Sequence, residues 1–229
     1  MDEDRFMAEF EFIYVGDPMC SWCYGFGPVM ERLDKRFTFR TRLVVGGLRP
    51  GPAAAILDDR MRRFLQEHWE EIGERTGQPF DLTGLDRENW AYDTMTADTA
   101  AVTMRELDAG VALPFFARLQ RAFYAEAVDV TDPAVYPELL ADFTIDTDRF
   151  ADELASAAMR DTTLADFAEA RALGATGFPT LYLGHGDDVY LVSGGYAPFE
   201  VLEKALIGFL DERFPEEIAN LVRQPAAAD

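Results

Sequence analysis

β-strand character is confined to the two ends of this chain, and a long helix-patterned block separates them. Residues 10–15 and 37–45 are aromatic and β-branched runs of the kind that form buried strands. Between these runs, residues 22–36 repeat apolar side chains at helical spacing. Strand, helix and strand in this order are typical of the opening of a βαβ unit.

Strand character returns only after Gly174, which is placed to end the last helix of the block. Residues 180–183 and 189–192 predict a hairpin, and an amphipathic helix follows it. Because both ends supply strands, we expect one α/β domain with a large all-helical insertion. The predicted boundaries are 1–52 and 174–215 for the discontinuous α/β domain, 53–173 for the insertion and 216–229 for a C-terminal tail.

Length and charge exclude several classes of function. A chain of 229 residues with 48% hydrophobic content can bury a sizeable core. Its formal net charge of −21 repels phosphate groups, so we expect no nucleic-acid partner and no docking on anionic membranes. The acidic start and the lack of an apolar run of about 20 residues predict a cytoplasmic protein without a membrane span.

The two cysteines, Cys20 and Cys23, form a C-x-x-C motif where the first strand gives way to the first helix. Unpaired N–H groups and the helix dipole at that position stabilise a thiolate on the first cysteine. Cys23 follows one turn later and can resolve a mixed disulfide formed at Cys20. We therefore expect Cys20 to be exposed and nucleophilic, and Cys23 to be more buried.

Other interpretations of the cysteine pair are weaker. A zinc site needs further ligands, and His68 and His185 are isolated from each other in the sequence, so no metal is expected. A disulfide across so short a loop stabilises little, and a reducing cytosol rarely supports one. Inert buried cysteines remain as an alternative, but the strand–C-x-x-C–helix context is specific to redox chemistry.

Three segments together resemble the DsbA-like branch of the thioredoxin superfamily, and within it the bacterial cytoplasmic FrnE-type proteins. They are Asp-Pro-Met-Cys-Ser-Trp-Cys-Tyr at 17–24, Gly-Gly-Leu-Arg at 46–49 and Gly-Ala-Thr-Gly-Phe-Pro-Thr at 174–180. The resemblance implies a thioredoxin-like fold with a helical insertion. It also implies a thiol–disulfide oxidoreductase that acts on thiol- or disulfide-containing proteins or small thiols. Its only redox group would be the disulfide itself, with glutathione as an expected co-substrate.

The resemblance also implies roles for residues around the cysteines. Pro179 would be a cis-proline facing the disulfide, and the Phe178 backbone would pair with an extended substrate segment. The expected substrate-binding residues are Trp22, Phe178, Pro179 and Thr180, and those expected to shape the site are Ser21, Pro18 and Tyr24.

The chain departs from the family pattern in two respects. The dipeptide between the cysteines is Ser21-Trp22, without the histidine of strongly oxidising relatives, so we expect a weaker oxidant. The family's buried acid, which relays the proton of the resolving cysteine, would fall six residues before Cys20. That residue is Tyr14, and the nearby acids Glu11 and Asp17 do not occupy the expected position.

Two further functions remain open from the sequence. A glutathione-dependent isomerase or transferase on the same scaffold could use Arg49 to hold a carboxylate, although retention of both cysteines argues against it. A client-binding protein would instead use an apolar groove in the helical block and would not need the cysteines.

Overall fold

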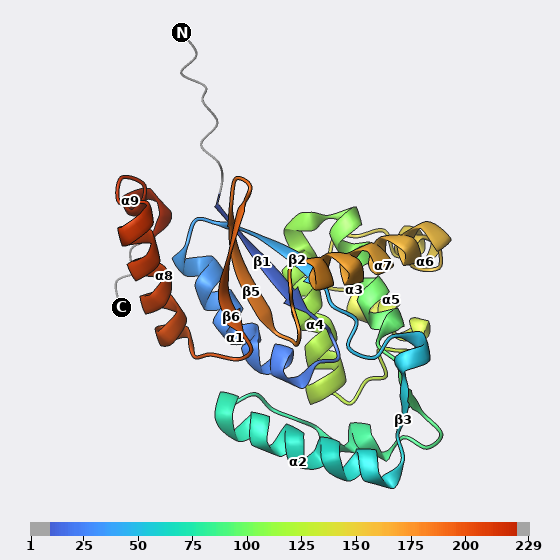
Figure 1. The fold of residues 1–229 in the computed structure, drawn as a ribbon. Helices are drawn as coiled ribbons and strands as arrows, with labels where there is room; N and C mark the ends of the chain where they lie inside the picture. Colours follow the sequence, from blue (N-terminus) through green and yellow to red (C-terminus); the bar gives the residue numbers. More distant parts are fainter. Residues whose placement is uncertain (1–9, 224–229) are drawn as a thin grey trace.

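A four-stranded sheet is assembled from both ends of the chain, as the sequence predicts (Figure 1). The computed structural model describes residues 10–223. The strands are β1 (Phe10–Gly16), β2 (Arg40–Val45), β5 (Thr180–His185) and β6 (Asp188–Gly194), in the order β2-β1-β5-β6. β1 runs parallel to β2 and antiparallel to β5, and β5 runs antiparallel to β6. β1 is therefore a central strand.

Alternate side chains of β1 pack into two different cores. Phe12 and Tyr14 point into the large core shared with the helices, whereas Ile13 and Val15 join a smaller cluster with Ala170. This alternation follows from the two-residue period of a strand. The continuous apolar run in the sequence is therefore explained by burial on both faces.

Helices cover both faces of the sheet. The helices α1 (Ser21–Arg36) and α8 (Phe199–Arg213) lie side by side, joined by ion pairs from Arg32 to Glu200 and from Arg36 to Glu203. α7 (Ala157–Ala172) packs against β2 on the other face. The short α9 (Ile218–Leu221) follows α8, and Phe37 forms an isolated β-bridge with Val222.

The insertion is predominantly helical and shares its core with the sheet. Its helices are α2 (Asp59–Thr76), α3 (Met95–Leu107), α4 (Ala112–Ala125), α5 (Tyr136–Leu139) and α6 (Thr147–Leu154), together with α7. Short 3-10 turns cover Gly51–Ala53, Leu82–Asp86, Ala109–Val111 and Pro133–Val135. Phe115 and Phe123 of α4 belong to the same buried cluster as Phe12 of β1. The inserted block is thus fastened to the sheet through a continuous core.

Some local boundaries differ from the sequence expectation. A two-stranded ribbon, β3 (Ala55–Ile56) with β4 (Ala91–Tyr92), interrupts the block. α7 begins at Ala157 because the Ser156 side chain accepts a hydrogen bond from Met159 N at 3.0 Å and caps the helix. The domain boundaries stay a prediction, and residues 1–9 and 224–229 lie outside the described part of the chain.

No helix within residues 10–223 is both long enough and apolar enough to cross a membrane.

A buried ion pair fixes the end of β2 against α3 and α7. Asp166 accepts hydrogen bonds from Val45 N at 2.9 Å and from two nitrogens of Arg105 at 2.6 and 3.1 Å. Arg105 also donates to the Leu43 carbonyl at 2.8 Å. Charged groups that lose water need such partners, so the pair holds together three elements next to the loop that follows β2.

Replacing Asp166 by alanine should remove the carboxylate that accepts the hydrogen bonds at this junction. Arg105 would stay largely buried without its main partner, and Val45 N would lose its hydrogen bond, so we expect a loss of about 3–5 kcal/mol in the free energy of unfolding. Urea denaturation measures this loss. Glu106→Ala, which removes the more exposed partner of Arg105, is the control and should cost less than about 1 kcal/mol. Equal losses in the two variants would contradict the assignment.

Candidate active site

The cysteine motif lies where β1 leads into α1. Cys20 is the N-cap residue of α1, with Cys20 N bonded to the Asp17 carbonyl and Tyr24 N to the Cys20 carbonyl, both at 3.0 Å. The N–H groups of the first turn therefore open toward the Cys20 end of the helix. Cys23 lies in that first turn, and both residues are free thiols.

A segment from the other end of the chain meets Cys20. The peptide bond between Phe178 and Pro179 is cis, and the Cys20 thiol donates to the Phe178 carbonyl at 3.5 Å. The sheet register explains the encounter, because Val15 of β1 pairs with Thr180 of β5. The turns that flank these two paired residues consequently lie next to each other.

Burial of the two thiols differs from the expectation in one respect. Cys23 is fully buried, as expected, but Cys20 retains only 6% exposure and is not the exposed residue that the sequence suggested. The Phe178 carbonyl covers it from one side. Burial raises the pKa of the Cys23 thiol well above its usual value, and the adjacent Cys20 raises it further.

The other predicted site residues differ in their exposure and in what their side chains contact. Trp22 is half-buried and contacts His68 and Tyr196, with ring centroids 5.9 and 5.6 Å away. Thr180 is buried and donates its hydroxyl to Gly177 O at 2.8 Å, so its side chain serves the loop. Pro18, Ser21 and Tyr24 are buried around the turn and support it from within.

Asp17 holds two loops together beneath the cysteines. Its carboxylate accepts Met19 N at 2.7 Å and Leu48 N at 2.6 Å, which joins the cysteine turn to the Gly-Gly-Leu-Arg segment. Gly46 in that segment lies against Phe178, and a Cβ at Gly46 would come within 2.0 Å of the Phe178 ring. A glycine is therefore required for Phe178 to reach this position.

A second carboxyl group, Asp98, lies beside Asp17 and was missed by the sequence reasoning. Thr94 donates to Asp98 Oδ2 at 3.0 Å, while Oδ1 has no hydrogen-bond partner within residues 10–223. Burial raises the pKa of Asp98 well above its usual range, and the negative charge of Asp17 raises it further. This environment favours the neutral form of the Asp98 carboxyl. The sequence feature that could have revealed Asp98 is a single acidic residue within a run of alanine and threonine.

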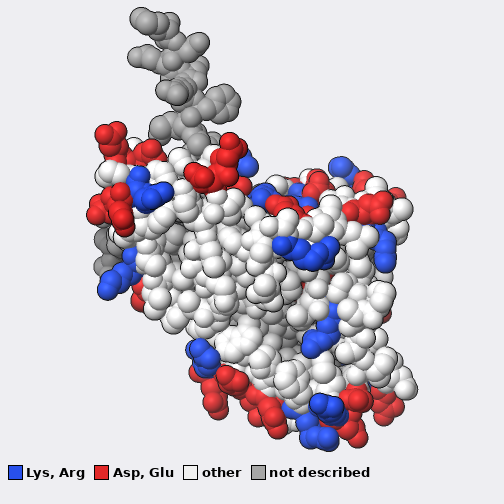
Figure 2. All heavy atoms as spheres, viewed as in Figure 1, with Lys and Arg blue, Asp and Glu red and all other residues white. Residues whose placement is uncertain are grey.

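Trp22 and the side chains packed next to it form an aromatic and basic rim, which we define as Trp22, Phe64, His68, Arg75 and Tyr196. Arg75 lies 5.0 Å above the Trp22 ring, and the Phe64 ring stacks on His68 with centroids 5.5 Å apart. Figure 2 shows charged side chains gathered along the margins of the molecule and a largely uncharged, hollowed region between α2 and the sheet.

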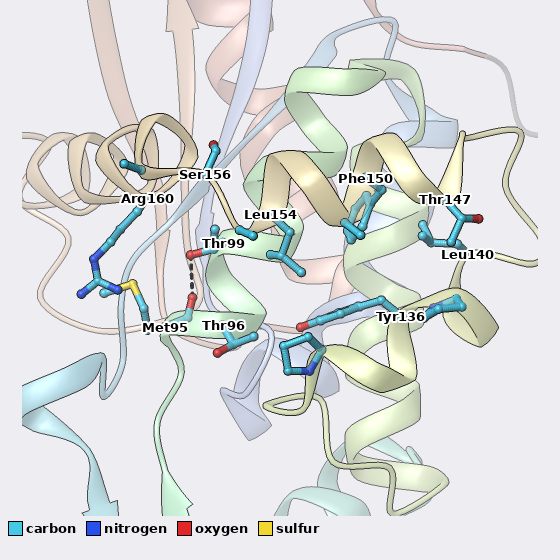
Figure 3. Close-up of a pocket in the computed structure, with 15 residues that line it drawn as sticks. Met95, Thr96, Thr99, Tyr136, Leu140, Thr147, Phe150, Leu154, Ser156 and Arg160 are labelled. Carbon is cyan, nitrogen blue, oxygen red and sulfur yellow. Dashed lines mark hydrogen bonds between the residues drawn. The ribbon is translucent and has the colours of Figure 1, made fainter.

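A separate cavity of about 410 Å³ lies among α3, α5, α6 and the start of α7, and no cysteine lines it (Figure 3). Its inward polar groups already have partners: Thr99 donates to Met95 O at 2.8 Å and Tyr136 to Val130 O at 2.7 Å. Within residues 10–223, no group of three or more His, Cys, Asp or Glu side chains is placed to hold a metal ion. The redox-capable chemistry is at Cys20 and Cys23.

The protonated state of Asp98 predicts a pH-dependent stability. A carboxyl whose pKa is raised by folding contributes stability that is complete below its unfolded value, near 3.8, and is lost as pH rises through the folded value. Asp98→Asn cannot ionise. Its free energy of unfolding should therefore improve relative to the wild type as pH rises from 4 to 8, by up to about 1.4 kcal/mol per pH unit.

Urea unfolding at several pH values tests this expectation. The exposed Asp161 of α7 provides the control, because Asp161→Asn should leave the pH dependence unchanged. A constant difference between Asp98→Asn and wild type at all pH values would show that Asp98 carries no proton in the folded protein.

Comparison with known proteins agrees with this geometry. The family model described as "DSBA-like thioredoxin domain" matches residues 13–206. A structure of a putative protein disulfide isomerase from Nitrosomonas europaea is 33% identical, with a TM-score of 0.82 over 90% of this chain and 99% of that chain.

Two further relatives have a stated activity or role. The cytosolic disulfide reductase DsbM from Pseudomonas aeruginosa is 26% identical, with a TM-score of 0.74 over 88% of this chain and 99% of that one. The same reductase is also known in a structure with GSH. The ClpXP adapter protein SpxH from Bacillus subtilis (strain 168) is 25% identical over 212 residues, 90% of this chain and 69% of that protein. The chain belongs to the family of DSBA-like thioredoxin domains.

Proposed function

We propose that the protein is a cytoplasmic thiol–disulfide oxidoreductase in which Cys20 is the nucleophile and Cys23 the resolving cysteine. The contact between the Cys20 thiol and the Phe178 carbonyl, at the N-terminus of α1, is the observation that carries this proposal. Both sulfurs lie within one helical turn, which matches the geometry of a dithiol that cycles through a disulfide. Similarity to a cytosolic disulfide reductase supports the location.

The reaction follows from the order of burial. Cys20, nearer the surface, attacks a substrate disulfide and forms a mixed disulfide, releasing the first substrate thiolate. Cys23 then attacks Cys20 from the interior, and the second substrate thiol leaves. Two electrons pass from the dithiol to the substrate, and the reverse sequence oxidises a substrate dithiol.

The loop ending in Pro179 would hold the substrate backbone. The Phe178 carbonyl contacts the Cys20 thiol, so an extended peptide that lies along Gly177 and Phe178 would have its sulfur next to the thiol. The aromatic and basic rim would contact the side chains that flank the substrate cysteine. Such a surface accepts varied thiol- or disulfide-containing partners because aromatic contacts need little directionality.

Cysteine variants test the mechanism. In the Cys20→Ser variant, the rate of insulin reduction by dithiothreitol should fall to the uncatalysed rate, because the variant lacks the nucleophile. Cys23→Ser should still attack but fail to resolve, so a mixed disulfide accumulates and is visible by mass spectrometry. The double variant gives the blank. Full activity in Cys20→Ser would reject the mechanism, and glutathione conjugation or isomerisation that survives in the double variant would favour the transferase or isomerase alternative.

Glutathione is a second proposed substrate, as the reductant that recycles the disulfide. Arg49 is half-buried over the Tyr92 ring at 5.0 Å, and no ion pair of its guanidinium occurs within residues 10–223. Burial lowers the pKa of the His68 imidazole; the negative charge of Glu71 opposes this shift, and the positive charge of Arg49 adds to it. A cation in this position could bind the carboxylate of a small thiol. The related reductase with GSH favours this assignment.

Arg49→Met should therefore raise the KM for glutathione by about tenfold, the loss of one charge-assisted hydrogen bond. The turnover number should change little, because the cysteines are untouched. Steady-state kinetics with glutathione and with an uncharged disulfide, such as hydroxyethyl disulfide, separate the two effects. Arg63→Met, at an exposed arginine of α2, is the control. An unchanged KM in Arg49→Met would remove this residue from the glutathione site.

A further inference from the structure

A second and larger cavity, of about 780 Å³, lies between α1 and α4 and is separate from the candidate active site. Neither cysteine lines it, and neither does any residue of the Phe178–Pro179 loop or of the aromatic and basic rim. Binding sites for small organic molecules are cavities of this size range, mostly apolar and with a few placed polar groups. The volume of the cavity therefore suits a small organic molecule.

The sequence of α1 opens this space. A Cβ at Gly27 would meet only Gln120 Oε1, at 3.9 Å, so the glycine leaves room between the two helices. Pro28 has no N–H and cannot bond the Tyr24 carbonyl one turn before it. Gln78 Nε2 donates to that carbonyl instead, at 3.2 Å, and the side chain of Gln78 completes the wall. This side of the cavity is therefore a built surface whose free carbonyl already has a partner.

Two buried polar groups that line the cavity have no partner. The Gln120 amide nitrogen and the Tyr14 hydroxyl make no hydrogen bond within residues 10–223, although Gln120 is only 1% and Tyr14 only 2% exposed. Burying a polar group without a hydrogen bond is costly, and native proteins rarely leave one so. Both groups are therefore available to a molecule that enters the cavity.

The lining determines which chemistry would bind. Gln120 Nε2 can only donate, so the ligand must present an acceptor, and the Tyr14 hydroxyl can donate to the same group or accept from a neighbouring N–H. An apolar body, and an aromatic one above all, would pack well against the rest of the wall. The apolar residues of that wall are Met30, Leu113, Pro114, Phe116 and Ala117.

The charged residues of the lining disfavour an anion. Three carboxylates line the cavity, from Glu31, Asp34 and Glu126, against the single guanidinium of Arg121. Arg121 is already paired with Glu126 at 3.0 Å, and the chain as a whole carries a net charge of −21. A carboxylate or phosphate would have to enter against this field. The acceptor that Gln120 binds is therefore an uncharged one.

We propose that this cavity binds a small aromatic molecule through an uncharged carbonyl group. The carbonyl oxygen accepts the hydrogen bond of Gln120 Nε2 and lies within reach of the Tyr14 hydroxyl, while the ring packs against Phe116 and Met30. The site is additional to the thiol–disulfide activity and does not depend on it, because neither cysteine lines the cavity.

An NMR titration with naphthamide tests the proposal. Naphthoate and methylnaphthalene, substituted at the same ring position, have nearly the same shape but carry a negative charge or lack the carbonyl. Naphthamide should bind saturably and shift the signals of the Gln120 side-chain amide and the Gly27 backbone amide. The two comparison compounds should bind at least about tenfold more weakly, the loss of one hydrogen bond or its equivalent in charge repulsion.

Gln120→Met removes the donor and keeps an unbranched side chain of similar length. Its dissociation constant for naphthamide should rise at least about tenfold, because the carbonyl loses its hydrogen bond. Thermal melting shows whether the variant keeps its fold. Gln66→Met, at an exposed glutamine of α2, is the matched control and should bind naphthamide as the wild type does.

A second variant fills the cavity and leaves Gln120 and Tyr14 intact. Gly27→Leu places an apolar side chain in the open space beside Gln120, and leucine is a better helix former than glycine, so α1 should not be weakened. Binding of naphthamide should be lost. Gly208→Leu, at an exposed glycine of α8 with nothing within 4 Å of its added Cβ, is the matched control and should leave binding unchanged.

The outcomes separate this site from the redox function. Binding of naphthamide that survives in Cys20→Ser and is lost in Gly27→Leu supports the site, whatever becomes of the cysteine mechanism. No saturable binding to the wild-type protein would overturn the proposal and leave water as the partner of the two buried groups. Equal affinity for the three compounds would overturn the assigned ligand class, and wild-type binding in Gly27→Leu would overturn the location.

Discussion

The site depends on one long-range constraint, the pairing of β1 with β5. Val15 pairs with Thr180, and this register brings the Phe178 carbonyl to 3.5 Å from the Cys20 thiol. A slip by one residue would turn every side chain of the strand to the opposite face. The aromatic side chains of Phe12 and Tyr14 fill one core and the aliphatic side chain of Ile13 fills the other, so a slip would put side chains of the wrong shape into both. Packing of the sheet thus sets the geometry of the redox centre.

Polar contacts beneath the cysteines fasten the surrounding loops. Asp17 joins the cysteine turn to Leu48, and Thr94 joins Arg49 to Asp98. Both carboxyl groups are fully buried, and burial raises the pKa of each, which favours the neutral form. The helical insertion therefore does more than cover the site, because α3 supplies part of the hydrogen-bond network that holds it.

The sequence alone determined the order of elements, the insertion and the cysteine motif, because these follow from local periodicity and from chemistry that adjacent residues carry. The motif that contains Pro179 was also recognisable, since its Gly-Phe-Pro-Thr loop precedes a strand. The burial of Cys20, the environment of Asp98 and the cavity lined by Tyr14 were decided only by tertiary structure. Each depends on segments distant in the chain meeting in space, and no local pattern records which buried polar groups find partners.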